Sequence, residues 1–138
     1  GAWNYMMSID TPASKKFAAS FKKRWGADRV VADPQESAYN MVYLWKQAVE
    51  DAGTFDDNAV REALVGQKFD APQGPVEVMP NHHLSQTVRI GEINAEGGFT
   101  ILEETGVVLP QAWNQKHPSS KGFACDWTDP SKGEKYKL

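Results

Sequence analysis

Three helical patterns follow one another in this 138-residue chain with almost no strand between them, and this order constrains the fold more than any other feature. A self-contained doubly wound α/β fold alternates strands and helices. Here one strand precedes the helices and three strands follow them. The wide apolar helix faces need strands to pack against, and the chain has almost no strands between its helices. We therefore expect the sequence to be part of a larger architecture.

The first helix has clear start and stop signals. Thr11 can accept hydrogen bonds as the N-cap residue, and Pro12 suits the first helical position. Gly26 ends the helix. The apolar stripe between these signals is narrow and consists of Phe17, Phe21 and Trp25.

The second helix has the strongest signals in the chain. Asp33 can cap it, Pro34 stands at its first position, Glu36 can reach back to the cap, and Gly53 ends it. Its apolar face is wide, so we expect the helix to be largely buried. This face consists of Ala38, Met41, Val42, Leu44, Trp45, Ala48, Val49 and Ala52.

The remaining elements are shorter. A third helix is capped by Asp56 or Asp57 and ends near Gly66. Residues Asp70–Pro75 form a cluster of turn signals. A first strand is expected over Ala2–Ser8, and a three-stranded antiparallel meander over Val76–Met79, Thr87–Ile93 and Phe99–Leu102.

Composition and charge exclude several classes of protein. The formal net charge is −3, which argues against a nucleic-acid binder. No apolar run is long enough to span a membrane, and no signal-peptide pattern is seen. The charge is uneven, however, because residues 11–31 hold six basic residues and Asp28 as the one acidic residue. This segment is either a solvated helix surface or an electrostatic steering surface for a partner.

Residues that often carry catalysis or metal binding do not form convincing patterns. His82 and His83 are adjacent rather than at ligand spacing, so a structural turn is preferred to a metal site. Cys125 is the single cysteine and is interpreted as inert, although its pairing with another molecule stays open. No phosphate-binding glycine motif is present. We expect no enzyme, no metal and no cofactor.

Several aromatic residues could form the walls of a small-ligand cleft, namely Trp3, Tyr5, Tyr39, Tyr43 and Trp45. For Trp45, and for its neighbour Met41, a place in the core is the preferred interpretation. Tyr39 lies near a helix N-terminus, where free N–H groups favour polar or anionic ligand atoms. A surface tyrosine beside a cap is the alternative.

Several stretches together resemble the C-terminal part of the urea- and short-chain-amide-binding branch of the type I periplasmic solute-binding proteins of ABC transporters. The run of motifs is more specific than any one of them. The stretches are Ser8–Pro12, Glu36–Tyr39, Leu44–Ala48, Phe69–Val76, Asn81–His83, Arg89–Ile93, Gly98–Phe99, Pro110–Trp113 and Gly122–Trp127.

The resemblance implies an α/β fold that is incomplete as a stand-alone unit. Family members consist of two lobes joined by crossover strands, with the ligand trapped when the lobes close. Residues 1–106 would form part of a lobe and the hinge region, and residues 107–138 an irregular aromatic tail. Most ligand-contacting loops would lie in the missing portion.

The resemblance also implies a function. The complete protein would bind urea or a short-chain amide in the periplasm and present it to ABC permease subunits. As candidate ligand contacts near the cleft edge we select Trp3, Tyr5, Glu36 and Tyr39. The segment alone is expected not to bind ligand and to form a homo-oligomer.

Two other functions stay open. The chain could be a stand-alone, self-associating interaction module, because helix faces that should be buried favour association. It could also be part of an amide-sensing regulator. Size-exclusion chromatography and the sequence upstream of Gly1 would discriminate among these functions.

Overall fold

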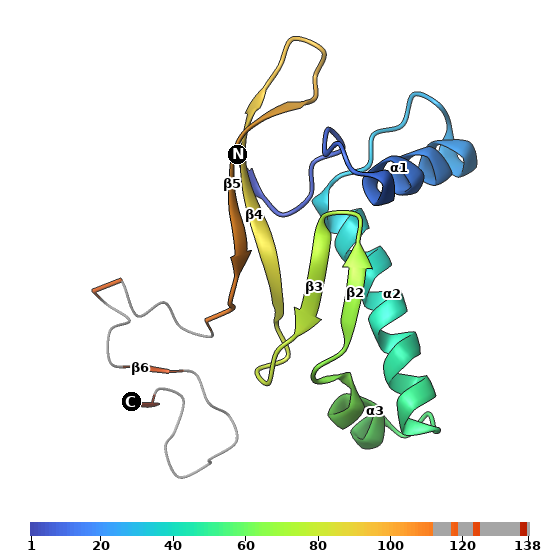
Figure 1. Ribbon diagram of the computed structural model, residues 1–138, viewed down its shortest axis with the longest axis vertical. Coiled ribbons are helices and arrows are strands. Elements are labelled where there is room, and N and C mark those ends of the chain that lie inside the picture. Colours follow the sequence, from blue (N-terminus) through green and yellow to red (C-terminus); the bar gives the residue numbers. More distant parts are fainter. Residues whose placement is uncertain (112–116, 119–122, 125–135, 138) are drawn as a thin grey trace.

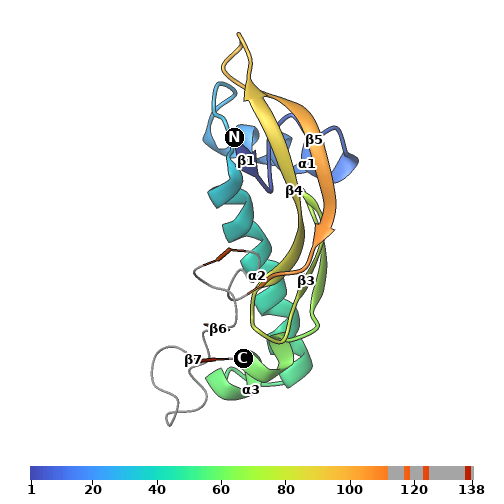
Figure 2. The same cartoon turned by 90° about the vertical axis from the view of Figure 1, so that its left-hand side faces the viewer.

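The computed structural model describes residues 1–111, 117–118, 123–124 and 136–137. Its main body is a twisted antiparallel sheet with helix α2 (Asp33–Ala52) along one face (Figures 1 and 2). Helices α1 (Pro12–Trp25) and α3 (Asp57–Leu64) lie near opposite ends of α2. Within the described residues no helix has the length and apolar character needed to cross a membrane.

The signals that delimit α1 and α3 act as predicted. The Thr11 Oγ1 atom accepts a hydrogen bond from the Ser14 amide at 3.2 Å, and Pro12 is the first residue of α1. The Gly26 amide donates to the Lys22 carbonyl, which closes the last turn. At α3, Asp56 rather than Asp57 is the cap, and its Oδ1 atom accepts from two amides of the first turn.

The start of α2 differs from the prediction. Ala32 is the N-cap residue, and the Gln35 side chain accepts from its amide at 3.2 Å. Asp33 instead accepts from the amides of Asn4 and Tyr5, at 3.0 and 2.7 Å. The prediction that Asp33 caps the helix and that Glu36 reaches back to the cap is therefore wrong. Asp33 is bound by backbone amides that are distant in the sequence, and the Glu36 carboxylate is buried, where it accepts from Asn40 and the Gln73 amide.

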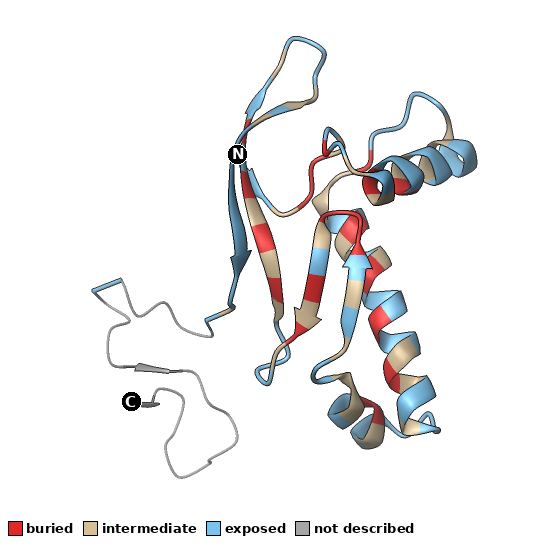
Figure 3. Ribbon diagram, viewed as in Figure 1, coloured by how far each residue is buried: buried red, intermediate tan, exposed pale blue. Residues whose placement is uncertain are grey.

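Helix α2 is buried along one stripe only (Figure 3). The stripe has a spacing of four residues and consists of Glu36, Asn40, Leu44 and Ala48. Met41 is 49% exposed and Trp45 is 48% exposed, so the interpretation of both as core residues is wrong. The physical reason is geometric: one face of α2 meets the sheet and α3 packs near its C-terminal end, while Met41 and Trp45 lie on the remaining, exposed side.

The sheet contains one more strand than predicted. Strand β2 (Lys68–Ala71) pairs with β3 (Gly74–Val78), and the turn signals between them form a tight hairpin. Strand β4 (Leu84–Ile93) and strand β5 (Phe99–Val108) form a long hairpin, and β5 extends well beyond the predicted Leu102. Strand β1 is limited to Ala2–Trp3.

Strand β4 organises the sheet. Its first residues pair with β3, its last part pairs with β1, and β5 follows its other edge. All strand pairs among the described residues are antiparallel. The structure is thus a partial α/β fold, as the sequence predicted, with helices on an antiparallel sheet.

Two small apolar clusters stabilise the body. One joins α1 to the segment after β1 and contains Tyr5, Ile9, Phe17 and Val31. The other joins α2 to β2 and β3 and contains Leu44, Ala71, Val76 and Val78. His82 and His83 lie in the connection between β3 and β4, where the sequence analysis predicted a turn. Cys125 lies outside the described residues.

Candidate functional site

A pocket of about 300 Å³ lies beside β1 and brings together Trp3 and Tyr5. One wall is formed by Trp3 and Phe99, whose ring centroids are 5.8 Å apart. The segment after β1, the segment before α2 and the β4–β5 turn complete the lining. Ser8, Asn94 and Glu96 supply its polar side chains. Its volume is at the lower end of the range for small-molecule sites, which suits a compact solute.

Tyr5 holds the base of this pocket in place. Its side chain is fully buried, its ring meets Phe17 edge-on at 5.6 Å, and its hydroxyl accepts from the Ser14 hydroxyl at 3.4 Å. Burial raises the pKa of Tyr5, and the Ser14 hydrogen bond opposes this shift. The phenol therefore stays neutral at physiological pH.

Glu36 lies in the interior rather than in the β1 pocket. It is 0% exposed, and its Oε1 atom accepts from Asn40 Nδ2 at 2.8 Å and from the Gln73 amide at 3.2 Å. Its Oε2 atom has no hydrogen-bond partner among the described residues. Burial raises the pKa of Glu36, while the hydrogen bonds and the nearby Arg89 guanidinium lower it. The raised pKa means that the folded protein favours the protonated carboxyl group more than water does.

Arg89 connects this interior site to the sheet. From β4 it donates to the carbonyls of Asn4 at 2.6 Å and Gln73 at 2.8 Å, and it forms an ion pair with Glu104 at 2.8 Å. The side chain is 5% exposed. The sequence analysis named Arg89 only as part of the motif Arg89–Ile93 and not as a site residue. An arginine between the apolar residues Val88 and Ile90 was the available signal.

Tyr39 belongs to a separate aromatic cluster. Its ring lies 4.7 Å from Phe17 and 4.8 Å from Tyr43, and Tyr43 stacks on Phe69 at 4.9 Å. Burial, together with the neighbouring Tyr43 hydroxyl, raises the pKa of Tyr39 to about 12. These rings line a second pocket of about 330 Å³, with Asp70 on its lining.

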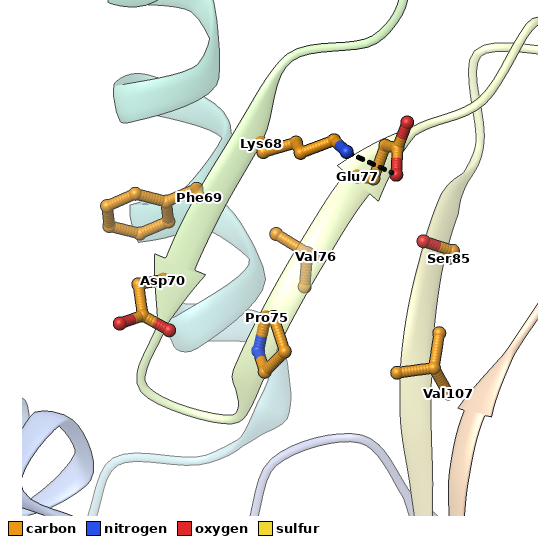
Figure 4. Close-up of a pocket in the computed structure, with 8 residues that line it drawn as sticks. All are labelled: Lys68, Phe69, Asp70, Pro75, Val76, Glu77, Ser85 and Val107. Atoms are coloured by element: carbon orange, nitrogen blue, oxygen red, sulfur yellow. Dashed lines mark ion pairs between the residues drawn. The ribbon is translucent and has the colours of Figure 1, made fainter.

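A third hollow lies on the open face of the sheet and contains none of the predicted site residues (Figure 4). Its volume is about 400 Å³, and Lys68 and Glu77 form an ion pair of 3.4 Å across the β2–β3 pair. The structure therefore brings Trp3 and Tyr5 into one pocket, places Tyr39 at another, and buries Glu36 in the interior.

The partial α/β body has the fold of a known protein family. Residues 1–119 match the periplasmic binding protein domain, and the chain belongs to that family. A solute-binding protein of an ABC transporter from Rhodopseudomonas palustris BisB5, in complex with 3,4-dihydroxybenzoic acid, has the same fold, with a TM-score of 0.67 and 22% identity. That comparison covers 78% of this chain and 31% of the solved one.

Two curated relatives also match. A protein from Geobacillus stearothermophilus named limonene hydroxylase is 30% identical over 107 residues, which are 78% of this chain and 20% of the relative. The Leu/Ile/Val-binding protein homolog 6 of Brucella abortus (strain 2308) is 28% identical over 93 residues, which are 66% of this chain and 24% of the relative. The chain thus spans less than a third of each of these proteins.

Proposed function

We propose that this chain forms part of the solute-binding component of an ABC importer. The observation that carries the proposal is the match of residues 1–119 to the periplasmic binding protein domain. The complete protein would capture a small solute in the periplasm, close by a hinge motion, and present the solute to permease subunits. Binding rather than catalysis is the proposed chemistry, and the name limonene hydroxylase stays with a relative of which this chain covers 20%.

We further propose urea or a short-chain amide as the solute. The support is the ordered run of motifs from Ser8–Pro12 to Gly122–Trp127, which together resemble the urea- and amide-binding branch. The β1 pocket offers matching chemistry, because Trp3 can exclude water while Ser8 and Asn94 can bond to amide groups. Glu36 and Tyr39 remain candidate contacts, to be tested beside Trp3 and Tyr5.

Calorimetric titration of the complete protein tests the solute class. The panel consists of urea, acetamide, leucine and 3,4-dihydroxybenzoic acid. We expect saturable heat with urea or acetamide, and a dissociation constant that rises when Trp3 is replaced by alanine. Trp25→Ala is the matched control, because Trp25 is 60% exposed and lies on α1 away from the pocket. Binding of leucine or the aromatic acid alone would refute the amide assignment while leaving the importer proposal intact.

The 138-residue segment alone is expected not to bind urea or acetamide, because most of a two-lobed cleft would be missing. Saturable binding by the isolated segment would contradict this expectation.

Self-association is a second candidate, favoured by one specific observation. Met41, Val42 and Trp45 of α2 expose 49%, 63% and 48% of their surface, and Trp45 lies 6.1 Å from the exposed ring of Phe55. Exposed apolar groups of this kind mark association surfaces. Size-exclusion chromatography with light scattering would show a dimer or larger species for the isolated segment. A stable monomer would refute self-association.

A further inference from the structure

Helix α1 carries an unusual surplus of positive charge. Its 14 residues contain five basic residues and no aspartate or glutamate. The basic residues are Lys15, Lys16, Lys22, Lys23 and Arg24. The importer function proposed above makes no use of this charge.

The four lysines share one face of the helix. Lys15 and Lys22 are seven residues apart, as are Lys16 and Lys23, so each pair lies on nearly the same line along the helix. At about 100° per residue the centre of this face is opposite Phe17, the residue that anchors α1 to the core. Lys16 lies at the edge of the face and also lines the pocket beside Tyr39. Figure 3 shows α1 exposed along most of its length, on the side opposite β4 and β5 in this view. We refer to these four lysines as the lysine face.

Helix stability explains only part of this charge. Basic residues in the last turn interact favourably with the helix dipole, which accounts for Lys22 and Lys23. Lys15 and Lys16 lie near the positive end of the dipole, where a positive charge is unfavourable. Among the described residues only Lys15 of the lysine face has an ion-pair partner, Asp10. The remaining charge is available to a partner.

We propose that the lysine face docks on an acidic periplasmic surface of the importer's permease subunits. This inference rests on the function proposed above. The net negative charge of residues 33–104 would orient this contact, since the segment contains 13 acidic and four basic residues. An acidic partner is attracted to α1 and repelled by much of the rest of the chain, so the charge distribution selects one docking orientation.

A protein surface fits the lysine face better than a lipid surface does. A helix that binds in a membrane interface exposes an apolar face next to its basic residues. In α1 the apolar face is already used, because Phe17 is 9% exposed and packs against Tyr5 and Tyr39. Trp25 is exposed, but it projects to a different side of the helix from the lysine face and lies against Arg24 at 4.9 Å.

The test compares two triple variants of the complete protein with equal changes in net charge. The first, K15E/K22E/K23E, reverses three charges of the lysine face and leaves Lys16, which also lines the pocket beside Tyr39. The control, K46E/R61E/K68E, reverses exposed charges of α2, α3 and β2. Solute uptake is measured in proteoliposomes that contain the permease and ATPase subunits, at increasing concentrations of binding protein. We expect the lysine-face variant to raise the half-saturating concentration by about tenfold or more. The control variant should leave it within about twofold.

Two further readouts identify the partner. A photo-crosslinking amino acid replaces Ala19, an exposed residue at the centre of the lysine face, and replaces the exposed Asn58 on α3 as the control position. In cells we expect the Ala19 position alone to yield a crosslink, identified by mass spectrometry as a permease subunit and lost in K15E/K22E/K23E. Equal uptake by the two triple variants, or no such crosslink, would overturn the proposal. Charge-dependent binding only to vesicles containing phosphatidylglycerol, without the permease, would also overturn it.

Solute titration of the same variants separates this inference from the proposed function. Both triple variants should bind solute as the unmodified protein does. If the unmodified protein binds no solute, the proposed function fails, and the crosslink from position Ala19 still decides whether α1 docks on a permease.

Discussion

Replacement of Glu36 by glutamine is expected to stabilise the protein at neutral pH. The carboxylate is fully buried, and its Oε2 atom has no partner among the described residues. Glutamine keeps an oxygen that can accept from Asn40 and the Gln73 amide, and it removes the charge. Arg89 would not be left unpaired, because it retains Glu104 and two backbone carbonyls. The substitution therefore removes a desolvation cost without breaking the network.

The size of the effect depends on pH. Glutamine places its amide nitrogen where Oε2 lacks a partner, so the gain comes from the lost charge and not from a new hydrogen bond. Because an ionised buried carboxylate carries a desolvation cost that the neutral amide avoids, we expect Glu36→Gln to raise the free energy of unfolding by about 1–3 kcal/mol at pH 8. Burial raises the pKa of Glu36 above its ordinary value of 4.5, so the folded protein holds the proton more tightly than the unfolded chain. The contribution of Glu36 to the stability of the unmodified protein is therefore fully present below pH 4.5 and is lost as the pH rises through the raised pKa. The advantage of glutamine should disappear at the acidic end of this range.

Urea denaturation at a series of pH values, followed by tryptophan fluorescence, measures this difference. Glu50→Gln is the control, because Glu50 is exposed and pairs with Lys46 on the surface of α2. It should change stability by less than about 1 kcal/mol at any pH. A Glu36→Gln variant that is destabilised at pH 8 would refute the reasoning, since it would mean that the ionised carboxylate is favourable in the network.

Two substitutions test the packing. Leu44→Ala should destabilise the protein by about 2–5 kcal/mol, because Leu44 is 0% exposed in the cluster beneath β2 and β3; a loss below about 1 kcal/mol in urea denaturation would contradict this. Gly91→Ala should cost about 1–3 kcal/mol, because the new Cβ would come within 2.6 Å of the sulfur of Met6, which is 1% exposed; an unchanged melting temperature would show that Met6 can move away.

Local signals in the sequence were sufficient for most helix boundaries, although not for the start of α2. Thr11 with Pro12 begins α1, Asp56 caps α3, and Gly53 ends α2 in the left-handed region with a φ of 63°. Each of these signals acts within a few residues, so no knowledge of the rest of the fold is needed. The resemblance based on the ordered motifs likewise predicted the periplasmic binding protein family, which residues 1–119 match.

Long-range contacts explain what the sequence analysis missed. Strand β2 escaped notice because its residues Lys68–Ala71 overlap the turn signals before Gly74, and pairing with β3 creates the strand. The exposure of Met41 and Trp45 depends on what faces α2, which apolar periodicity does not reveal. The sequence analysis also did not foresee that Glu36 and Tyr39 lie apart from the pocket of Trp3 and Tyr5, because contacts between distant elements set their positions.

A polar junction, rather than the apolar clusters alone, positions the β1 pocket. Asp33 at the start of α2 accepts from the amides of Asn4 and Tyr5, while Arg89 donates to the carbonyl of Asn4. The segment after β1 is thus held between α2 and β4 by its own backbone. Because backbone groups carry no sequence signature, the junction could be found only in the structure. It also makes the orientation of Tyr5 depend on Asp33 and Arg89, so a rotation of α2 against β4 would change the shape of the pocket directly.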